Sequence, residues 1–335
     1  MGRVLTLGEF LLRFTPLYNH RIRQADTFTS HFGGAEANVA INLSQYGHQT
    51  SFLSALPSND IGQAAVSTLR EAGVDTSFVK KQEGRMGIYF YEEGFSLKSP
   101  QVIYDRENSS FLRLAEATVD WDAIFKDTDI FHLTGITLAL HEDMKNFTFQ
   151  ALKEAKRRRV QISFDFNYRS QLWSISEAKE VFLKVLPYVD IGFFGYKDLS
   201  AFFPGGETLP ASFKQEVLEG ELRKASEDYG IDYIACTNRE VLSQSENTLT
   251  GYLYDDGSLV KSSTYSFEVL ERIGGGDAFA SGILHGILQG LKREEIVEFG
   301  TASSVLKHFV YGDYTQFSAE EVERFITEKG EGSFR

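Results

Sequence analysis

Apolar and polar positions change their period repeatedly along this chain. Short runs rich in apolar and β-branched residues, as expected of buried strands, alternate with longer stretches whose apolar residues recur every three to four positions, as expected of helices. The expected strands are residues 4–7, 51–53, 130–133, 161–164 and 190–193, and the expected helices are residues 35–46, 61–72, 141–158 and 215–229. This alternation predicts an α/β fold with a mainly parallel sheet and helices on both of its faces.

Two stretches, residues 13–32 and 84–114, depart from this alternation. They carry strand-like patterns, such as the aromatic runs at 88–91 and 102–104, with turn residues and no good helical pattern between them. Antiparallel strands inserted in a parallel α/β domain predict a small sheet beside the main one, placed as a lid over a site. A surface hairpin without a functional role is an equally good interpretation of the pattern alone.

The composition indicates a globular protein of a reducing compartment. With 335 residues and 42% hydrophobic content, the chain can build one large α/β domain with a full core, or two modest ones. The single cysteine, Cys236, excludes an intrachain disulfide, and its apolar neighbours favour a small core residue over a nucleophile. The sequence shows neither a secretory leader nor a run of about 18 apolar residues, so we expect a cytoplasmic protein that does not cross a membrane.

The charge balance narrows the class of ligand. The formal net charge is -13 at pH 7, and a surface of this sign repels nucleic acid and anionic membranes, which both demand a basic face. We therefore expect neither of them as a partner. An acidic protein that binds phosphate or carboxylate must concentrate cations locally, so arginines in apolar or aromatic surroundings are candidate ligand-binding residues.

The segment with the clearest chemistry is a run of three glycines, Gly274, Gly275 and Gly276, followed by Asp277 and a helical pattern. Consecutive glycines let the backbone approach a ligand, and the start of a helix presents unpaired N–H groups, so the segment predicts an anion site. A carboxylate beside an anion is unfavourable for binding alone, but Asp277 suits a base that accepts the proton of an attacking hydroxyl. A capping role for Asp277 in the first helical turn is an equally good interpretation.

Other nucleotide-binding and hydrolase motifs are absent from the sequence. There is no G-x-x-x-x-G-K-[ST], the G-x-G-x-x-G pattern breaks at Phe279, and the protein-kinase triplets H-R-D and D-F-G do not occur. Neither G-x-S-x-G nor H-E-x-x-H is found. Interpretations as a P-loop ATPase, a Rossmann dehydrogenase, an α/β-hydrolase or a zinc protease therefore lose their main support.

Two separated motifs resemble the signatures of the ribokinase-like (PfkB) carbohydrate kinases. Residues 274–279, Gly-Gly-Gly-Asp-Ala-Phe, resemble that family's G-A-G-D-x-F signature, and residues 33–40, Gly-Gly-Ala-Glu-Ala-Asn-Val-Ala, resemble its N-terminal G-G-x-x-x-N-x-A signature. The resemblance covers nearly the whole chain. It implies a three-layer α/β/α domain over residues 1–325 with lid strands at about 13–32 and 84–114, a C-terminal tail at 326–335, and ATP and Mg²⁺ as cofactors.

Finer features resemble the 2-keto-3-deoxygluconate kinases within that family. These features are the opening segment 8–16, residues 133–137, the segment 165–173 and the lead-in Glu271-Arg272. The Asn-Tyr-Arg part of 165–173 is the most telling. A neutral sugar gives no reason for a guanidinium at the end of a sheet strand, whereas Arg169 can bind the carboxylate of an acid sugar through a two-point contact.

The resemblance also implies roles for individual substrate-binding residues. Gly34 and Asn38 would contact sugar hydroxyls, and Arg169 would meet the carboxylate. The lid residues Tyr89, Tyr104 and Arg106 would close over the substrate. Ordinary packing within the lid sheet is the alternative for the two tyrosines, and a solvated side chain is the alternative for Arg106.

Two segments depart from the family pattern. Where family members often carry Asn-x-x-Glu, this chain has Gly-Tyr-Lys-Asp at 195–198, which keeps an acid and loses the amide, so the ligands of the expected Mg²⁺ stay unassigned. Where a T-x-G loop is usual, residues 237–240 read Thr-Asn-Arg-Glu, and Arg239 is in a position to meet a nucleotide phosphate. The expected nucleotide-binding residues are Lys197, Asp198, Thr237 and Arg239.

The sequence thus predicts ATP-dependent phosphorylation of a sugar hydroxyl, with 2-keto-3-deoxygluconate as the leading substrate and its 6-phosphate as the product. Asp277 would be the general base, and the amides of residues 274–276 would stabilise phosphoryl charge. Two other functions stay open, a kinase for a neutral ketose such as fructose and a catalytically silent regulator that binds sugar or nucleotide. Exposed lid sheets with apolar faces often pair, so we also expect a homo-oligomer.

Overall fold

The structure, a computed structural model, describes residues 1–94, 98–210, 212–241, 243 and 246–328. Its strands are β1 (Arg3–Leu7), β2 (Leu11–Pro16), β3 (Phe28–Gly33), β4 (Gln49–Pro57), β5 (Val79–Gln82), β6 (Ile88–Glu92), β7 (Gln101–Asp105), β8 (Ile130–Thr134), β9 (Gln161–Asp165), β10 (Ile191–Phe193), β11 (Tyr233–Val241), β12 (Glu246–Asp255), β13 (Ser258–Lys261) and β14 (Tyr265–Glu268). Its α-helices are α1 (Ala35–Gln45), α2 (Asp60–Glu71), α3 (Trp121–Ile124), α4 (Gly135–Leu140), α5 (Glu142–Arg157), α6 (Ile175–Val185), α7 (Tyr196–Phe202), α8 (Gln215–Tyr229), α9 (Gly275–Gln289), α10 (Arg293–Lys307) and α11 (Ala319–Glu328).

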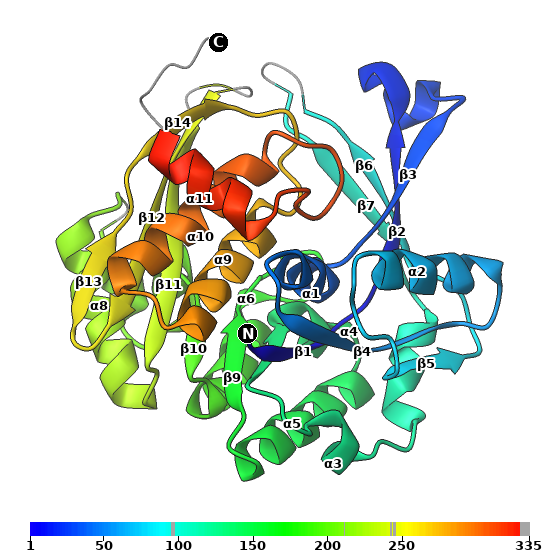
Figure 1. The fold of residues 1–335 in the computed structure, drawn as a ribbon, viewed down its shortest axis with the longest axis horizontal. Helices are drawn as coiled ribbons and strands as arrows, with labels where there is room; N and C mark the ends of the chain where they lie inside the picture. The colour runs from blue at the N-terminus through cyan, green and yellow to red at the C-terminus, as the bar shows by residue number, and fades with distance from the viewer. Residues whose placement is uncertain (95–97, 211, 242, 244–245, 329–335) are drawn as a thin grey trace.

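A ten-stranded sheet runs through the main body in the order β13-β12-β11-β10-β9-β8-β1-β4-β5, with β14 paired to β12 (Figure 1). Neighbours from β5 to β11 are parallel. Strand β12 pairs antiparallel with β11, β13 and β14. The predicted mainly parallel sheet is therefore confirmed. The carboxyl ends of the parallel strands share one edge, which is where open α/β sheets bind their ligands.

Strand residues alternate between two apolar layers because successive side chains point to opposite faces of a sheet. Leu5 and Leu7 pack on one face with residues of α5, α6 and α8, whereas Val4 packs on the other face with residues of α1, α9 and α10. Strands buried on both faces read as continuous apolar runs. The predicted arrangement of helix layers on both faces is confirmed.

A second, four-stranded sheet in the order β3-β2-β6-β7 projects beside the main sheet (Figure 1). It contains both stretches that we expected to form a lid, and its two hairpins, β2–β3 and β6–β7, are antiparallel as expected. The hairpins join through a parallel pairing of β2 with β6, which the sequence pattern did not predict. The pairing is parallel because β2 follows β1 and β6 follows β5, and these two strands of the main sheet point the same way.

The helices expected over 35–46, 61–72, 141–158 and 215–229 are α1, α2, α5 and α8. Cys236 is buried, and burial raises the pKa of its thiol to about 12, as expected for a core residue rather than a nucleophile. In the expected C-terminal tail, residues 326–328 complete α11, and 329–335 lie outside the described residues. No helix in the described part of the chain is long and apolar enough to cross a membrane.

Candidate active site

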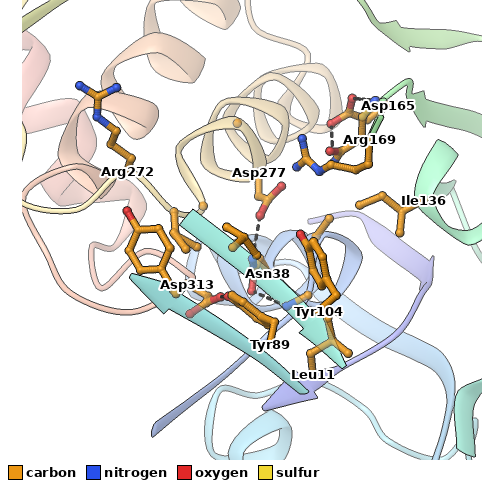
Figure 2. A pocket seen from close by; sticks show the side chains of 18 of the residues that line it. Leu11, Asn38, Tyr89, Tyr104, Ile136, Asp165, Arg169, Arg272, Asp277 and Asp313 are labelled. Carbon is orange, nitrogen blue, oxygen red and sulfur yellow. Dashed lines mark hydrogen bonds between the residues drawn. The ribbon is translucent and has the colours of Figure 1, made fainter. Parts of the chain in front are cut away.

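A cavity of about 820 Å³ lies where the lid sheet faces the carboxyl edge of the main sheet (Figure 2). Its walls come from the lid strands, from the first turns of α1 and α9, and from the segments that follow β8 and β9. This volume suits a small-molecule ligand. The predicted catalytic, anion-binding and sugar-binding residues all line it, namely Asp277, Gly274, Gly275, Gly276, Gly34, Asn38, Tyr89, Tyr104, Arg106 and Arg169.

The two signature motifs meet inside this cavity although they lie far apart in the sequence. The side-chain amide of Asn38 donates a hydrogen bond of 2.7 Å to the Asp277 carboxylate, and Asn38 in turn accepts one from the Gly34 N–H at 3.3 Å. Helices α1 and α9 pack together below this contact, where Asn42 donates to Ser281 at 3.1 Å. The Asp277 carboxylate is thus held by another helix and does not cap its own.

The glycine run forms the start of α9. Gly274 is the N-cap, and the helix's first backbone hydrogen bond runs from the Ala278 N–H to the Gly274 carbonyl, so the amides of residues 275–277 precede the hydrogen-bond ladder. Gly274 has a φ of +79°, and a Cβ there would lie 1.9 Å from the Asp313 carbonyl oxygen. A Cβ on Gly276 would meet no atom within 4 Å. The helix start is therefore packed tightly at Gly274 and open at Gly276.

Burial raises the pKa of two carboxyls in the cavity. It raises the pKa of Asp277 to about 7, against the opposing effects of the Asn38 hydrogen bond and the Arg169 charge. It raises the pKa of Asp165 to about 8, and the neighbouring Asp277 charge adds to this rise. A carboxyl that titrates near neutral pH is suited to accept a proton during a reaction at that pH.

The lid covers the cavity with two tyrosines and an arginine. The rings of Tyr89 and Tyr104, which face each other across β6 and β7, have centroids 5.8 Å apart. Arg106 lies over the Tyr104 ring and forms an ion pair with Glu9, to which its Nε donates at 2.8 Å. The Arg106 side chain is only 10% exposed. A lid arginine that is already paired with a carboxylate has less charge left to offer to an anionic ligand.

Arg169 reaches the cavity from the loop that follows β9. Asp165 ends this strand and accepts a hydrogen bond of 2.9 Å from the Asn167 N–H, and Asn167 has a φ of +39°, so the chain turns sharply there. Figure 2 shows the Arg169 guanidinium directed toward Asp277. Among the described residues, no carboxylate forms an ion pair with Arg169, although its charge lowers the pKa of the Asp277 and Asp165 carboxyls. The guanidinium can therefore still bind a ligand.

Comparison with known proteins decides the family. The family described as "pfkB family carbohydrate kinase" matches residues 1–208. A curated relative, the 2-dehydro-3-deoxygalactonokinase of Haloferax volcanii, is 30% identical over 97% of this chain and 96% of its own length. The chain belongs to the pfkB family of carbohydrate kinases. The enzyme class and the family predicted from the two signature motifs are confirmed.

Solved structures of pfkB relatives confirm the fold. The 2-dehydro-3-deoxygluconokinase of Thermotoga maritima superimposes with a TM-score of 0.91 at 33% identity, covering 98% of this chain and all of that one. A fructokinase of Xylella fastidiosa, solved with bound ATP, has a TM-score of 0.79 at 20% identity and covers 98% of both chains. The predicted ribokinase-like three-layer fold with its small lid sheet is confirmed. At 20% identity, the second likeness supports the fold alone.

Of the four residues predicted to bind nucleotide, one lines the cavity and three do not. Arg239 lines the cavity, together with Arg272. Lys197, Asp198 and Thr237 lie outside the residues that line it. Asp198 accepts a hydrogen bond of 2.9 Å from the Gly195 N–H at the start of α7, so its carboxylate serves the local turn. Roles of these residues in nucleotide binding stay predictions.

Sequence reasoning missed four carboxylates that line the cavity of this kinase: Glu9, Glu36, Asp165 and Asp313. Glu36 is 2% exposed and accepts hydrogen bonds from the Thr134 backbone and hydroxyl and from the Thr137 hydroxyl. Glu9, Glu36 and Asp165 lie in segments that resemble family motifs, but the sequence alone predicted no function for their side chains. Asp313 lies in a segment without any motif, so only the three-dimensional structure reveals it.

Proposed function

We propose that this chain transfers the terminal phosphate of ATP to the terminal hydroxyl of an acid sugar, 2-keto-3-deoxygluconate or a close relative. The observation that carries the proposal is that one cavity holds a carboxyl with a near-neutral pKa, the start of a long helix and an unpaired guanidinium. Two of the similar proteins carry the names of 2-dehydro-3-deoxygalactono- and 2-dehydro-3-deoxygluconokinases. These names support the same substrate class.

In the proposed reaction Asp277 accepts the proton of the attacking hydroxyl. The hydroxyl oxygen forms a bond to the terminal phosphorus while the bond from that phosphorus to the leaving oxygen of ADP breaks. The amides that precede the hydrogen-bond ladder of α9 would donate to the phosphoryl oxygens, whose negative charge is adjacent to the positive end of the helix. Asn38 would hold the Asp277 carboxylate in place for the proton transfer.

The sugar would lie between the lid and the start of α1. Gly34 and Asn38 would contact its hydroxyls, Tyr89 and Tyr104 would cover it, and Arg169 would bind its carboxylate. A Cβ on Gly34 would lie 2.1 Å from the Glu9 carbonyl oxygen, so glycine is required for the close backbone approach there. Arg106 would orient the substrate by hydrogen bonding rather than supply a full charge, because Glu9 balances it.

The nucleotide would approach the same cavity with its phosphates toward α9. Arg239 lines the cavity and would meet a phosphate, and Lys197, Asp198 and Thr237 would bind more distant parts of ATP. Mg²⁺, when bound, would neutralise phosphate charge. This ion is usually held by phosphates, water and one or two carboxylates. Asp165 is a cavity carboxyl that fits, because a bound cation would favour its deprotonated form over the protonated form that its pKa of about 8 indicates. The described residues contain no cluster of three or more potential metal-ligating side chains.

A neutral ketose such as fructose is the second candidate substrate. The observation that favours it is the Glu9–Arg106 ion pair, which removes one of the two guanidinium charges expected for an anionic sugar. We further propose that the protein acts in the cytoplasm and forms a homo-oligomer through its lid.

A kinase assay coupled to ADP formation tests the proposal. We expect faster turnover with 2-keto-3-deoxygluconate or its galacto epimer than with fructose or ribose. Asp277→Asn should keep the fold and sugar binding and lower kcat by about 10² to 10⁴, the range for a lost general base. Turnover near the wild-type rate in that variant would remove Asp277 from the mechanism. Sugar binding by the wild type without turnover on any sugar would instead support a silent regulator.

A further inference from the structure

Arg13 is the largest fully buried side chain in the described part of the chain. It lies on lid strand β2, directly opposite Tyr89 on β6, and its guanidinium points to the inner side of the lid. A buried guanidinium is costly unless it is paired and hydrogen-bonded. The side chains that pair with Arg13 therefore indicate its role in the protein.

Two acidic residues from outside the lid pair with Arg13. Its terminal nitrogens donate to both carboxylate oxygens of Glu271, and its Nε lies 3.1 Å from an oxygen of Asp313. Glu271 stands three residues before Gly274, the N-cap of α9, and Asp313 follows α10. Both carboxylates are at most 3% exposed. The ion pairs thus join the lid to the segment that leads into the phosphate-binding helix.

Further contacts close this cluster around Arg13, Glu271 and Asp313. The Tyr89 hydroxyl, on the lid, donates to Asp313, as Figure 2 shows. The Gly312 N–H donates to Glu271 at 2.7 Å. Asp313 also touches the helix start directly, since its carbonyl oxygen lies where a Cβ on Gly274 would be. One carboxylate residue therefore contacts both a lid tyrosine and the N-cap of α9.

Charge is balanced within this buried cluster. The fully buried Lys307 ammonium donates to the Val310 carbonyl at 3.1 Å and lies close enough to Glu271 and Asp313 to be stabilised by their charges. Two basic and two acidic side chains therefore meet in this cluster. A balanced and nearly dry set of charges is rigid, because moving any member exposes an unpaired charge to an apolar interior.

We propose that Arg13 is a positioning residue that couples closure of the lid over the sugar to the placement of the α9 amides at the nucleotide phosphate. This inference rests on the proposed kinase function. When the lid moves onto a sugar, β2 moves with β6 because the two strands are paired, and Arg13 carries Glu271 and Asp313 with it. The start of α9 is then held in its phosphate-binding position only when the lid is closed.

The test measures coupling between the two ligands in the full-length protein. The dissociation constant of the Mg²⁺ complex of a non-hydrolysable ATP analogue is measured with and without saturating 2-keto-3-deoxygluconate. For the wild type we expect about tenfold tighter nucleotide binding with the sugar, within the usual range of coupling between sites. Glu271→Gln, which keeps the shape and an oxygen for the Gly312 N–H, should reduce that ratio to below threefold and lower kcat more than it raises KM for the sugar.

Arg13→Met leaves two buried carboxylates without their guanidinium and can fail to fold, so two other variants keep the test decisive. Tyr89→Phe removes only the hydroxyl that donates to Asp313, and we expect a similar loss of coupling. Arg158→Met is the matched control, since it removes a guanidinium that pairs with Glu154 and Asp122 away from the cavity, and it should keep the wild-type ratio.

The outcomes separate this inference from the function on which it rests. A folded Glu271→Gln variant with the wild-type ratio overturns the inference and leaves the kinase function intact, as does a wild type that turns over sugar without any coupling. A wild type without turnover on any sugar overturns both. A variant that changes only the melting temperature, with ratio and kcat unchanged, shows a merely structural role for the cluster.

Discussion

Asp277 should determine how the activity depends on pH. Burial raises the pKa of its carboxyl to about 7, and only the deprotonated form can accept the proton of the sugar hydroxyl. We therefore expect kcat/KM to rise with pH and to level off above an apparent pKa near 7, whereas an unperturbed carboxyl would give a level profile down to about pH 4. Measurement of kcat/KM between pH 5 and 9 checks this expectation.

Asp60→Asn is the control for that profile, because Asp60 lies exposed in the first turn of α2 and does not line the cavity. It should reproduce the wild-type curve. A wild-type profile that is level down to pH 5 would contradict the raised pKa. It would leave open only a base that titrates well below neutral pH.

The two arginines of the proposed sugar site should differ in importance. Arg169 makes no ion pair with a described carboxylate, whereas Arg106 is paired with Glu9. Losing a charged hydrogen bond costs about 1.5–3 kcal/mol, so Arg169→Ala should lower kcat/KM for 2-keto-3-deoxygluconate roughly ten- to a hundredfold and change that for fructose little. Arg169→Lys should restore part of the loss, since it keeps the charge without the planar fork.

Arg106→Ala should harm both sugars, because it also leaves the Glu9 carboxylate buried without its cation. The ratio of the kcat/KM values for the acid and neutral sugars separates the two residues. Equal losses on both sugars in Arg169→Ala, or a wild type that prefers fructose, would contradict the acid-sugar assignment. The kinase assignment would survive either result.

At the residue scale, the sequence predicts the partners that lie in motifs and misses those that do not. Asp277 and Asn38 stand in two recognisable signatures, and the structure joins them by a hydrogen bond. The pairing of Arg106 with Glu9 could not be predicted, since it joins residues 97 positions apart whose local patterns say nothing of each other. Asp313 carries no local signal at all. Which acidic and basic side chains pair with each other depends on how the whole chain folds.

The start of α9 should tolerate a methyl group at one glycine and not at another. Gly274 has a φ of +79°, and its Cβ would lie 1.9 Å from the Asp313 carbonyl oxygen, so Gly274→Ala forces the backbone to move. We expect a loss of about 1–3 kcal/mol in the free energy of unfolding, measured by urea denaturation. The loss of activity should be larger than this loss of stability explains, because the helix start would move away from the phosphate that we propose it binds.

Gly276→Ala is the matched comparison within the same helical turn. Its Cβ would meet no atom within 4 Å, and alanine favours helix over glycine, so its stability should equal or exceed that of the wild type. Equal destabilisation by the two substitutions would show that the glycines serve general flexibility. Only a difference between them supports a tight approach of the backbone at Gly274.

At the scale of the elements, the parallel strands were predictable because they are buried on both faces and appear in the sequence as apolar runs. The helices between them were predictable because their apolar residues recur every three to four positions. The join between the lid hairpins was not predictable. Strand β2 pairs with β6 because both leave the same edge of the main sheet, a relation that depends on the order of β1, β4 and β5. Local sequence patterns specify strands, whereas pairing partners depend on where the rest of the chain has placed them.

For the whole molecule, the outer face of the lid is a candidate surface for pairing between two copies of the chain. Alternation along the lid strands points Arg13, Tyr89 and Tyr104 toward the cavity and leaves Phe14 and Phe90 on the other face, where their rings stack at 5.7 Å. Ile103 lies on the same outer face, on the edge strand β7, and is 51% exposed. An apolar face beside an unpaired strand edge is a surface that proteins usually cover.

We therefore expect the lids of two chains to pair in solution, which sedimentation velocity at micromolar concentration checks. Ile103→Lys should shift the protein toward the monomer, because a charge placed in a covered apolar contact must be desolvated, while the stability of the monomer should hardly change at a position that is half exposed already. Ile175→Lys, at a residue of α6 that is 52% exposed and outside the lid, is the control and should leave the assembly intact.

A wild type that sediments as a monomer at 50 µM would make the expected homo-oligomer wrong. An oligomer that Ile103→Lys leaves unchanged would place the interface elsewhere on the molecule. If the lids do pair, the dimer would hold the strand that carries Arg13 against a second lid, and sugar affinity should then fall when the protein is diluted below its dissociation constant.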